Sequence, residues 1–126
     1  MKVLLVEDDP DFIALTEKIL SLRGHSVTTC ETGTKGLTAA LENEFDLMIL
    51  DLRLPELDGW EVARQVRLAK PEFPIIACSA NLMHAERERT KELGCNGFLG
   101  KPYTISDLIS TIEDYENGHH PKRTPQ

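Results

Sequence analysis

Three short, uninterrupted apolar runs constrain the fold of this chain more than any other feature of its sequence. They occupy residues 3–6, 47–50 and 75–78. Runs of this length and composition are typical of parallel strands that helices bury on both faces. Two half-polar segments, residues 26–29 and 96–99, also predict strands, and such weak strands belong at the edges of a sheet.

Apolar residues at three- and four-residue spacing predict helices between these strands. The stripes comprise Phe12, Leu15, Ile19 and Leu22; Leu37, Ala40 and Leu41; Val62, Ala63 and Val66; and Ile105, Leu108, Ile109 and Ile112, with a more polar fourth helix at residues 83–93. The alternation implies right-handed crossovers, and therefore an α/β fold with a doubly wound parallel sheet of five strands flanked by five helices. The ligand site of such a fold lies outside the carboxyl ends of its strands.

Polar side chains follow four of the predicted strands at that edge of the sheet. They are Glu7, Asp8 and Asp9 after the first strand, Asp51 after the third, Ser79 after the fourth, and Lys101 one glycine beyond the fifth. If the second strand lies at an edge, the other four strand ends are contiguous. These side chains should then converge on one pocket.

Carboxylates placed this close repel one another unless a hard divalent cation binds their oxygens. Mg²⁺ accepts one or two protein carboxylates and keeps positions open for a phosphate, which suits Asp8 and Asp51. A metal ion, an ammonium and hydrogen-bond donors together offset the charge on a phosphoryl group during its transfer. The pattern therefore predicts phosphoryl transfer, with Asp51 as the nucleophile.

Four motifs in order along the chain resemble the receiver domain of two-component response regulators, over about residues 2–116. They are V-E-D-D at 6–9, D-L-R-L-P-E-L-D-G at 51–59, C-S-A at 78–80 and K-P at 101–102. The resemblance implies the flavodoxin-like strand order 2-1-3-4-5 of the family's chemotaxis regulator. It also implies a cis peptide bond between Lys101 and Pro102.

The resemblance implies a role in phosphoryl transfer for each matching residue. Asp51 would accept the phosphoryl group from a sensor histidine kinase or a histidine phosphotransfer protein, and Ser79 and Lys101 would hold its oxygens. Mg²⁺, or Mn²⁺ in its place, would bind to Asp8, to Asp51 and to the backbone carbonyl of Arg53.

In the same resemblance, Glu7 would assist the metal through a water molecule. Ser79 and Phe98 would form a switch that changes the surface of the fourth helix, the fifth strand and the fifth helix, to which a downstream effector binds. Arg53 and Asn81 lie where the family sets the lifetime of the phosphoryl group.

Each of these residues also has a plain structural explanation when taken singly. Asp8, Asp9 or Asp11 could cap the first helix, and Asp51 could be a turn residue. Phe98 could simply fill the core. The four signals together, each at the end of its own strand, favour one functional site.

Three other functions remain to be compared with the receiver. A Mg²⁺-dependent phosphatase with an aspartyl-phosphate intermediate needs a second acid two residues after its nucleophile, where this chain has Arg53. A nucleotide or flavin carrier needs a loop of backbone donors after the first strand, where Glu7, Asp8 and Asp9 would repel a phosphate. A constitutive interaction domain that is never phosphorylated is the third alternative.

Charge and hydropathy bear on the partners and location of the chain. The net charge of -7 disfavours direct binding to nucleic acid, and no apolar run approaches the roughly 20 residues that span a bilayer. Acids end the first apolar run too early for a signal peptide, which predicts a cytoplasmic protein.

Residues 117–126 lose helical periodicity and predict a flexible tail after a receiver domain at residues 1–116. We therefore expect a stand-alone receiver, monomeric or dimeric on phosphorylation. We expect it to catalyse only its own phosphorylation and dephosphorylation.

Overall fold

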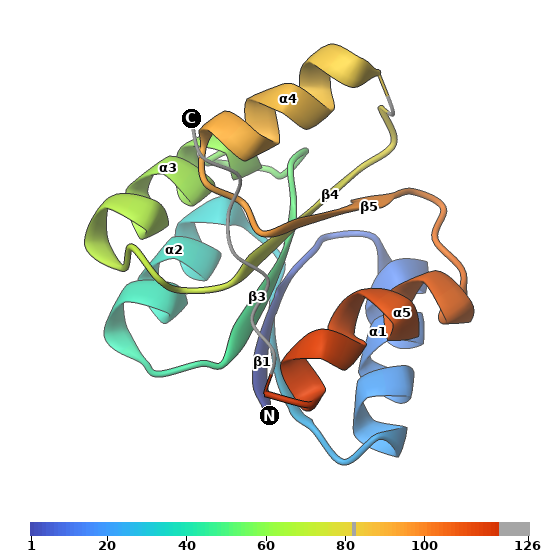
Figure 1. Cartoon of the computed structure of the whole chain (residues 1–126). Coiled ribbons are helices and arrows are strands. Elements are labelled where there is room, and N and C mark those ends of the chain that lie inside the picture. The colour runs from blue at the N-terminus through green and yellow to red at the C-terminus, as the bar shows by residue number, and fades with distance from the viewer. Residues whose placement is uncertain (82, 119–126) are drawn as a thin grey trace.

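The computed structural model describes residues 1–81 and 83–118, and shows five parallel strands that alternate with helices (Figure 1). The strands are β1 (Lys2–Val6), β2 (Ser26–Cys30), β3 (Leu47–Asp51), β4 (Ile75–Ser79) and β5 (Gly97–Gly100). The helices are α1 (Pro10–Leu22), α2 (Gly33–Glu42), α3 (Gly59–Ala69), α4 (His84–Glu92) and α5 (Ile105–Glu116). Residues 119–126, most of the predicted tail, lie outside the described part.

The strand order is β2-β1-β3-β4-β5, with parallel pairing throughout, which confirms the predicted doubly wound topology. The two half-polar strands, β2 and β5, lie at the edges. Every residue of β3 and β4 is buried, whereas β2 has no fully buried residue. The apolar runs therefore form the centre of the sheet because helices cover both of its faces.

Alternate side chains of each central strand enter two different cores. Leu5, Ile49 and Ile76 pack with α1 and α5, whereas Leu4 and Leu50 pack with α2 and α3. Figure 1 shows α1 and α5 on one face of the sheet and α2, α3 and α4 on the other. Within the described ranges, none of the helices combines the length and apolarity needed to cross a membrane.

Three apolar residues of the predicted helical stripes lie outside the core, so the prediction is wrong for them. Leu22 is 74% exposed, Leu41 41% and Ile105 48%. All three lie in the first or last turn of their helices. Periodicity identifies the apolar face of a helix, but it does not show how far the sheet extends beneath that face.

A polar cluster ties the end of α5 to the turn that follows α1. The Arg23 guanidinium donates to the Glu116 carboxylate at 2.7 Å, and His25 Nε2 lies 2.6 Å from the same carboxylate. His25 Nδ1 lies 2.8 Å from the amino group of Met1. The hydrogen bond from Arg23, assisted by His25, lowers the pKa of Glu116 to about 2.

Replacing Glu116 with Gln is expected to lower the free energy of unfolding by about 1 kcal/mol at neutral pH, since ion pairs near the surface contribute little more. A lowered folded-state pKa stabilises the fold above the unfolded-state value of 4.5, and this stabilisation is lost as the pH falls toward about 2. Urea unfolding of both proteins should therefore show a difference that shrinks across this range. Glu42→Gln, at an exposed acid, is the control, and a difference that stays constant with pH would contradict the assignment.

Candidate functional site

The polar residues predicted to converge lie at the carboxyl edge of the sheet, where Glu7, Asp8, Asp51 and Lys101 come together. Asp51 and Ser79 are the last residues of β3 and β4, while Glu7 and Lys101 directly follow β1 and β5. The Glu7, Asp51 and Ser79 residues are 1%, 4% and 1% exposed, respectively. Asp8, in contrast, is exposed at the mouth of the site. Parallel pairing places these groups together because all the strands end at the same edge.

The Lys101 ammonium joins two buried carboxylates. Its Nζ lies 2.8 Å from Glu7 Oε1 and 3.1 Å from Asp51 Oδ2. The Phe12 ring of α1 lies 4.7 Å from the same nitrogen. The Lys101-Pro102 peptide bond is cis, which confirms the prediction. Lys101 is thus held by charge from two strands and by an aromatic ring from a helix.

Glu7, Asp8 and Asp51 each offer a carboxylate oxygen, and these oxygens lie within 4.8 Å of one another. One ammonium pairs with two of these three carboxylates, which leaves an excess of negative charge. Oxygen donors in such an arrangement are the ligands that Mg²⁺ prefers. The cluster therefore has both the donors and the charge to hold a divalent cation.

The electrostatics of the site reflect this crowding. Burial raises the pKa of Glu7 to about 7, although its hydrogen bond from Lys101 acts in the opposite direction. Burial alone would lower the pKa of Lys101, but the hydrogen bonds and charges of Glu7 and Asp51 outweigh it and raise the pKa. A bound cation would supply the charge needed to keep the acids ionised together.

The loops at the site also orient the carboxylates. Asp51 Oδ1 accepts a hydrogen bond from the backbone N–H of Arg53 at 3.0 Å. Gly59 begins α3 so close to β3 that a Cβ there would lie 2.2 Å from the Asp51 carbonyl oxygen. Asp9 caps α1 by accepting from the backbone of Asp11 and Phe12. The capping explanation therefore applies to Asp9 and not to Asp8, whereas Asp51 does make a turn hydrogen bond, to the N–H two residues on, in addition to its contacts in the site.

The Ser79 hydroxyl faces α4 in this structure. It donates to Glu86 Oε1 at 3.2 Å and accepts from the backbone N–H of Asn81 at 3.0 Å. The Arg53 side chain, 71% exposed, extends to within 3.8 Å of the same Glu86 oxygen. Arg53 and Asn81 thus lie at the rim of the site, two residues after Asp51 and Ser79 in the sequence.

Two arginines of α4 stack on aromatic side chains. The Arg87 guanidinium lies 5.0 Å from the centre of the half-buried Phe98 ring, and that of Arg89 lies 4.0 Å from the Trp60 ring of α3. No pattern in the sequence indicates these contacts, nor those of Phe12 and Glu86. Helix α4 reads H-A-E-R-E-R-T-K-E, and nothing in that string distinguishes one glutamate or arginine from the next.

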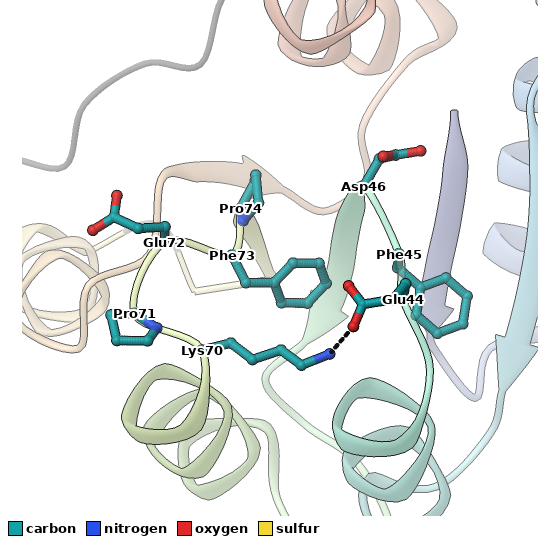
Figure 2. Close-up of a pocket in the computed structure, with 8 residues that line it drawn as sticks. All are labelled: Glu44, Phe45, Asp46, Lys70, Pro71, Glu72, Phe73 and Pro74. Atoms are coloured by element: carbon teal, nitrogen blue, oxygen red, sulfur yellow. Dashed lines mark ion pairs between the residues drawn. The ribbon is translucent and has the colours of Figure 1, made fainter.

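A separate hollow lies at the opposite, amino edge of the sheet (Figure 2). It is lined by Glu44, Phe45, Asp46, Lys70, Pro71, Glu72, Phe73 and Pro74. Lys70 points toward Glu44 there and donates to the backbone carbonyl of Asn43 at 2.9 Å. These residues precede β3 and β4, so the hollow has no part in the acidic site.

The chain matches one known protein family and several of its members. The family model of the response regulator receiver domain matches residues 3–113. The transcriptional regulatory protein HprR of Escherichia coli is 33% identical over 120 residues, which are 95% of this chain and 53% of HprR. The uncharacterized transcriptional regulatory protein YkoG of Bacillus subtilis is 34% identical over 110 residues, 87% of this chain and 48% of YkoG. The chain spans about half the length of these curated relatives.

Two solved structures share the fold over nearly their whole length. The receiver domain of the sensor histidine kinase PA1611 of Pseudomonas aeruginosa, solved with a magnesium ion coordinated in its active-site cleft, is 31% identical with a TM-score of 0.83, and the match covers 92% of this chain and 97% of that one. The chemotaxis response regulator CheY4 of Vibrio cholerae is 27% identical with a TM-score of 0.84, covering 90% and 97%.

Proposed function

Because the chain belongs to the response regulator receiver domain family, we propose that it carries a phosphoryl group reversibly on Asp51 and that this group controls the binding of a partner. The donor is the phosphohistidine of a sensor histidine kinase or of a histidine phosphotransfer protein. One observation carries the proposal: the buried Asp51 carboxylate lies 3.1 Å from the Lys101 ammonium and beside the carboxylates of Glu7 and Asp8.

In the proposed reaction, a carboxylate oxygen of Asp51 attacks the phosphorus atom of the donor in line. The P–N bond of the phosphohistidine breaks, its electron pair stays on the imidazole, and a P–O bond to Asp51 forms. Lys101 and the Ser79 hydroxyl offset the charge on the phosphoryl oxygens. Water later cleaves the aspartyl phosphate to inorganic phosphate, at a rate that Arg53 and Asn81 influence from the rim.

The carboxylate cluster fits Mg²⁺ as the cofactor of this reaction. Asp8, Asp51 and the backbone carbonyl of Arg53 would hold the ion, with Glu7 acting through water. When bound, it offsets negative charge on the transferring phosphoryl group. Lys101 can then hold a phosphoryl oxygen while it keeps its contact with Glu7.

Asp8→Asn is expected to weaken Mg²⁺ binding by at least about tenfold. Proteins usually bind Mg²⁺ through only one or two carboxylates, and this variant removes one of them. Thermal unfolding with and without Mg²⁺ measures the effect: the ion should raise the melting temperature of the wild type clearly more than that of the variant at the same Mg²⁺ concentration. Asp9→Asn is the matched control, because Asn also caps helices well and this variant should respond to Mg²⁺ as the wild type does. An undiminished Mg²⁺ response in Asp8→Asn would exclude Asp8 as a ligand.

The surface proposed to transmit the signal consists of α4, β5 and α5. Ser79 ends the strand that precedes α4, and Phe98 lies in β5 beneath Arg87. Movement of Ser79 toward a phosphoryl group would disturb this face first, because α4 has little apolar burial. A downstream effector that binds this face would then distinguish the two states.

The test of the proposed function is the mass of the intact protein after incubation with a small-molecule phosphodonor, with Mg²⁺ or with a chelator. A single phosphoryl adduct is expected with Mg²⁺ and not with the chelator. If no adduct forms with this donor or with a phosphorylated histidine phosphotransfer protein, the chain is a constitutive interaction domain and the proposal is wrong.

A further inference from the structure

Polar side chains, rather than apolar packing, attach α4 to the rest of the molecule. Within residues 84–92 only Thr90 is buried, and in the described ranges no side chain caps the helix at Met83. The attachments are instead made by Glu86, Arg87 and Arg89. Because packing of an apolar face supplies most of the stability of a helix in a protein, α4 is the helix that a change in polar contacts most easily releases.

The contact of Glu86 reaches the phosphorylation site itself. Its side chain is only 10% exposed, and its Oε1 accepts a hydrogen bond from the Ser79 hydroxyl at 3.2 Å. A backbone N–H already donates to the Ser79 oxygen. A hydroxyl has one proton to donate, so Ser79 cannot donate to Glu86 and to a phosphoryl oxygen at the same time.

We infer that Glu86 is a positioning residue that holds the Ser79 hydroxyl away from the phosphoryl site, an inference that rests on the proposed function of Asp51. Phosphorylation must then break this contact and release α4. A phosphoryl group carries about 1.5 to 2 negative charges, in place of the single charge of the Asp51 carboxylate, and places them closer to Ser79. These charges attract the Ser79 proton and repel the Glu86 carboxylate. The two arrangements exclude each other, which makes the pair a two-state element.

The neighbouring contacts extend this element to the proposed binding surface. Arg87, next to Glu86, lies over Phe98, and Arg89 lies over Trp60. Displacement of Glu86 moves the backbone that carries both arginines, so it uncovers both rings. Ser79 and Phe98 are therefore coupled through α4.

Beryllofluoride, a phosphoryl analogue that binds a carboxylate without a donor, gives a direct test by calorimetry in the presence of Mg²⁺. Loss of the competing acceptor in Glu86→Ala is expected to raise the affinity about tenfold, as for a hydrogen bond to a charged group. Glu86→Gln keeps an acceptor without the charge and should give a smaller gain. Glu88→Ala is the control, because Glu88 lies in the same helix with its side chain 43% exposed and should change the affinity less than twofold.

A double-mutant cycle separates positioning of Ser79 from a general loosening of α4. In the Ser79→Ala background, Glu86→Ala should change the affinity less than twofold. An unchanged or weaker affinity in the single variant, or the same tenfold gain without Ser79, would overturn the inference. If the wild type and Glu88→Ala give no binding heat at all, the proposed function itself fails, and the inference with it.

The single tryptophan of the chain, Trp60, supplies a second readout. Its ring contacts Arg89 of α4, so its fluorescence should change when α4 moves. Without beryllofluoride, Glu86→Ala should already shift the emission toward that of the loaded wild type, whereas Glu88→Ala should not. An unshifted Glu86→Ala spectrum would contradict release of α4.

Discussion

Asp51→Asn is expected to abolish the phosphoryl adduct. The amide nitrogen and oxygen of Asn are poor nucleophiles, whereas the shape of the side chain and its acceptor for the Arg53 N–H are preserved. The fold should remain intact, because Lys101 keeps Glu7 as a partner at 2.8 Å. Mass of the intact protein after treatment with the phosphodonor and Mg²⁺ measures the result.

Asp58→Asn is the matched control for that experiment. Asp58 lies in the same loop and caps α3 by accepting from the backbone of Glu61, and Asn performs this role equally well. The control should form the adduct at close to the wild-type rate. An adduct of undiminished yield in Asp51→Asn would show that another group accepts the phosphoryl.

Lys101→Met is expected to lower the free energy of unfolding of the metal-free protein by about 3 kcal/mol, because removal of one partner leaves buried charge unpaired. Glu7 and Asp51, 1% and 4% exposed, both lose the ammonium that faces them. Met is similar in length to Lys and can still pack against Phe12. Urea unfolding in the presence of a chelator measures the loss, and Mg²⁺ should restore part of it by supplying positive charge.

The control for this variant is Lys91→Met, on the surface of α4. Lys91 pairs with Glu88 at 3.4 Å, and its side chain is 51% exposed, so the change in stability should stay within about 0.5 kcal/mol. Equal stability of Lys101→Met and the wild type in chelator would show that the two buried acids do not depend on the ammonium.

The acidic site lowers the stability of the fold but favours the proposed reaction. Three acids lie close together with only one lysine to pair with them, and burial already raises the pKa of Glu7 to about 7. Such crowding opposes folding of the metal-free protein, but it leaves a place for a cation and a nucleophile beside it. The inferred role of Glu86 opposes phosphorylation in a second way, because the Ser79 hydroxyl donates to Glu86 and not to a phosphoryl oxygen.

The sequence alone determined the architecture and the members of the acidic site. Apolar runs at β1, β3 and β4 identify buried parallel strands, since no other element is short, apolar throughout and bounded by polar residues. Topology then places Glu7, Asp51, Ser79 and Lys101 at one edge, because parallel strands end on the same side. The members of this site could therefore be predicted without knowledge of side-chain packing.

Only the tertiary structure decided which side chains engage these groups. Three glutamates occur in α4, and Glu86 alone of them has a contact with Ser79 in the described part of the chain. Phe12 and Lys101 are 89 residues apart in sequence, yet their side chains meet. Local pattern encodes periodicity and strand ends, whereas contacts between polar side chains depend on how each helix is rotated against the sheet, and a charged helix such as α4 has no apolar stripe to specify that rotation.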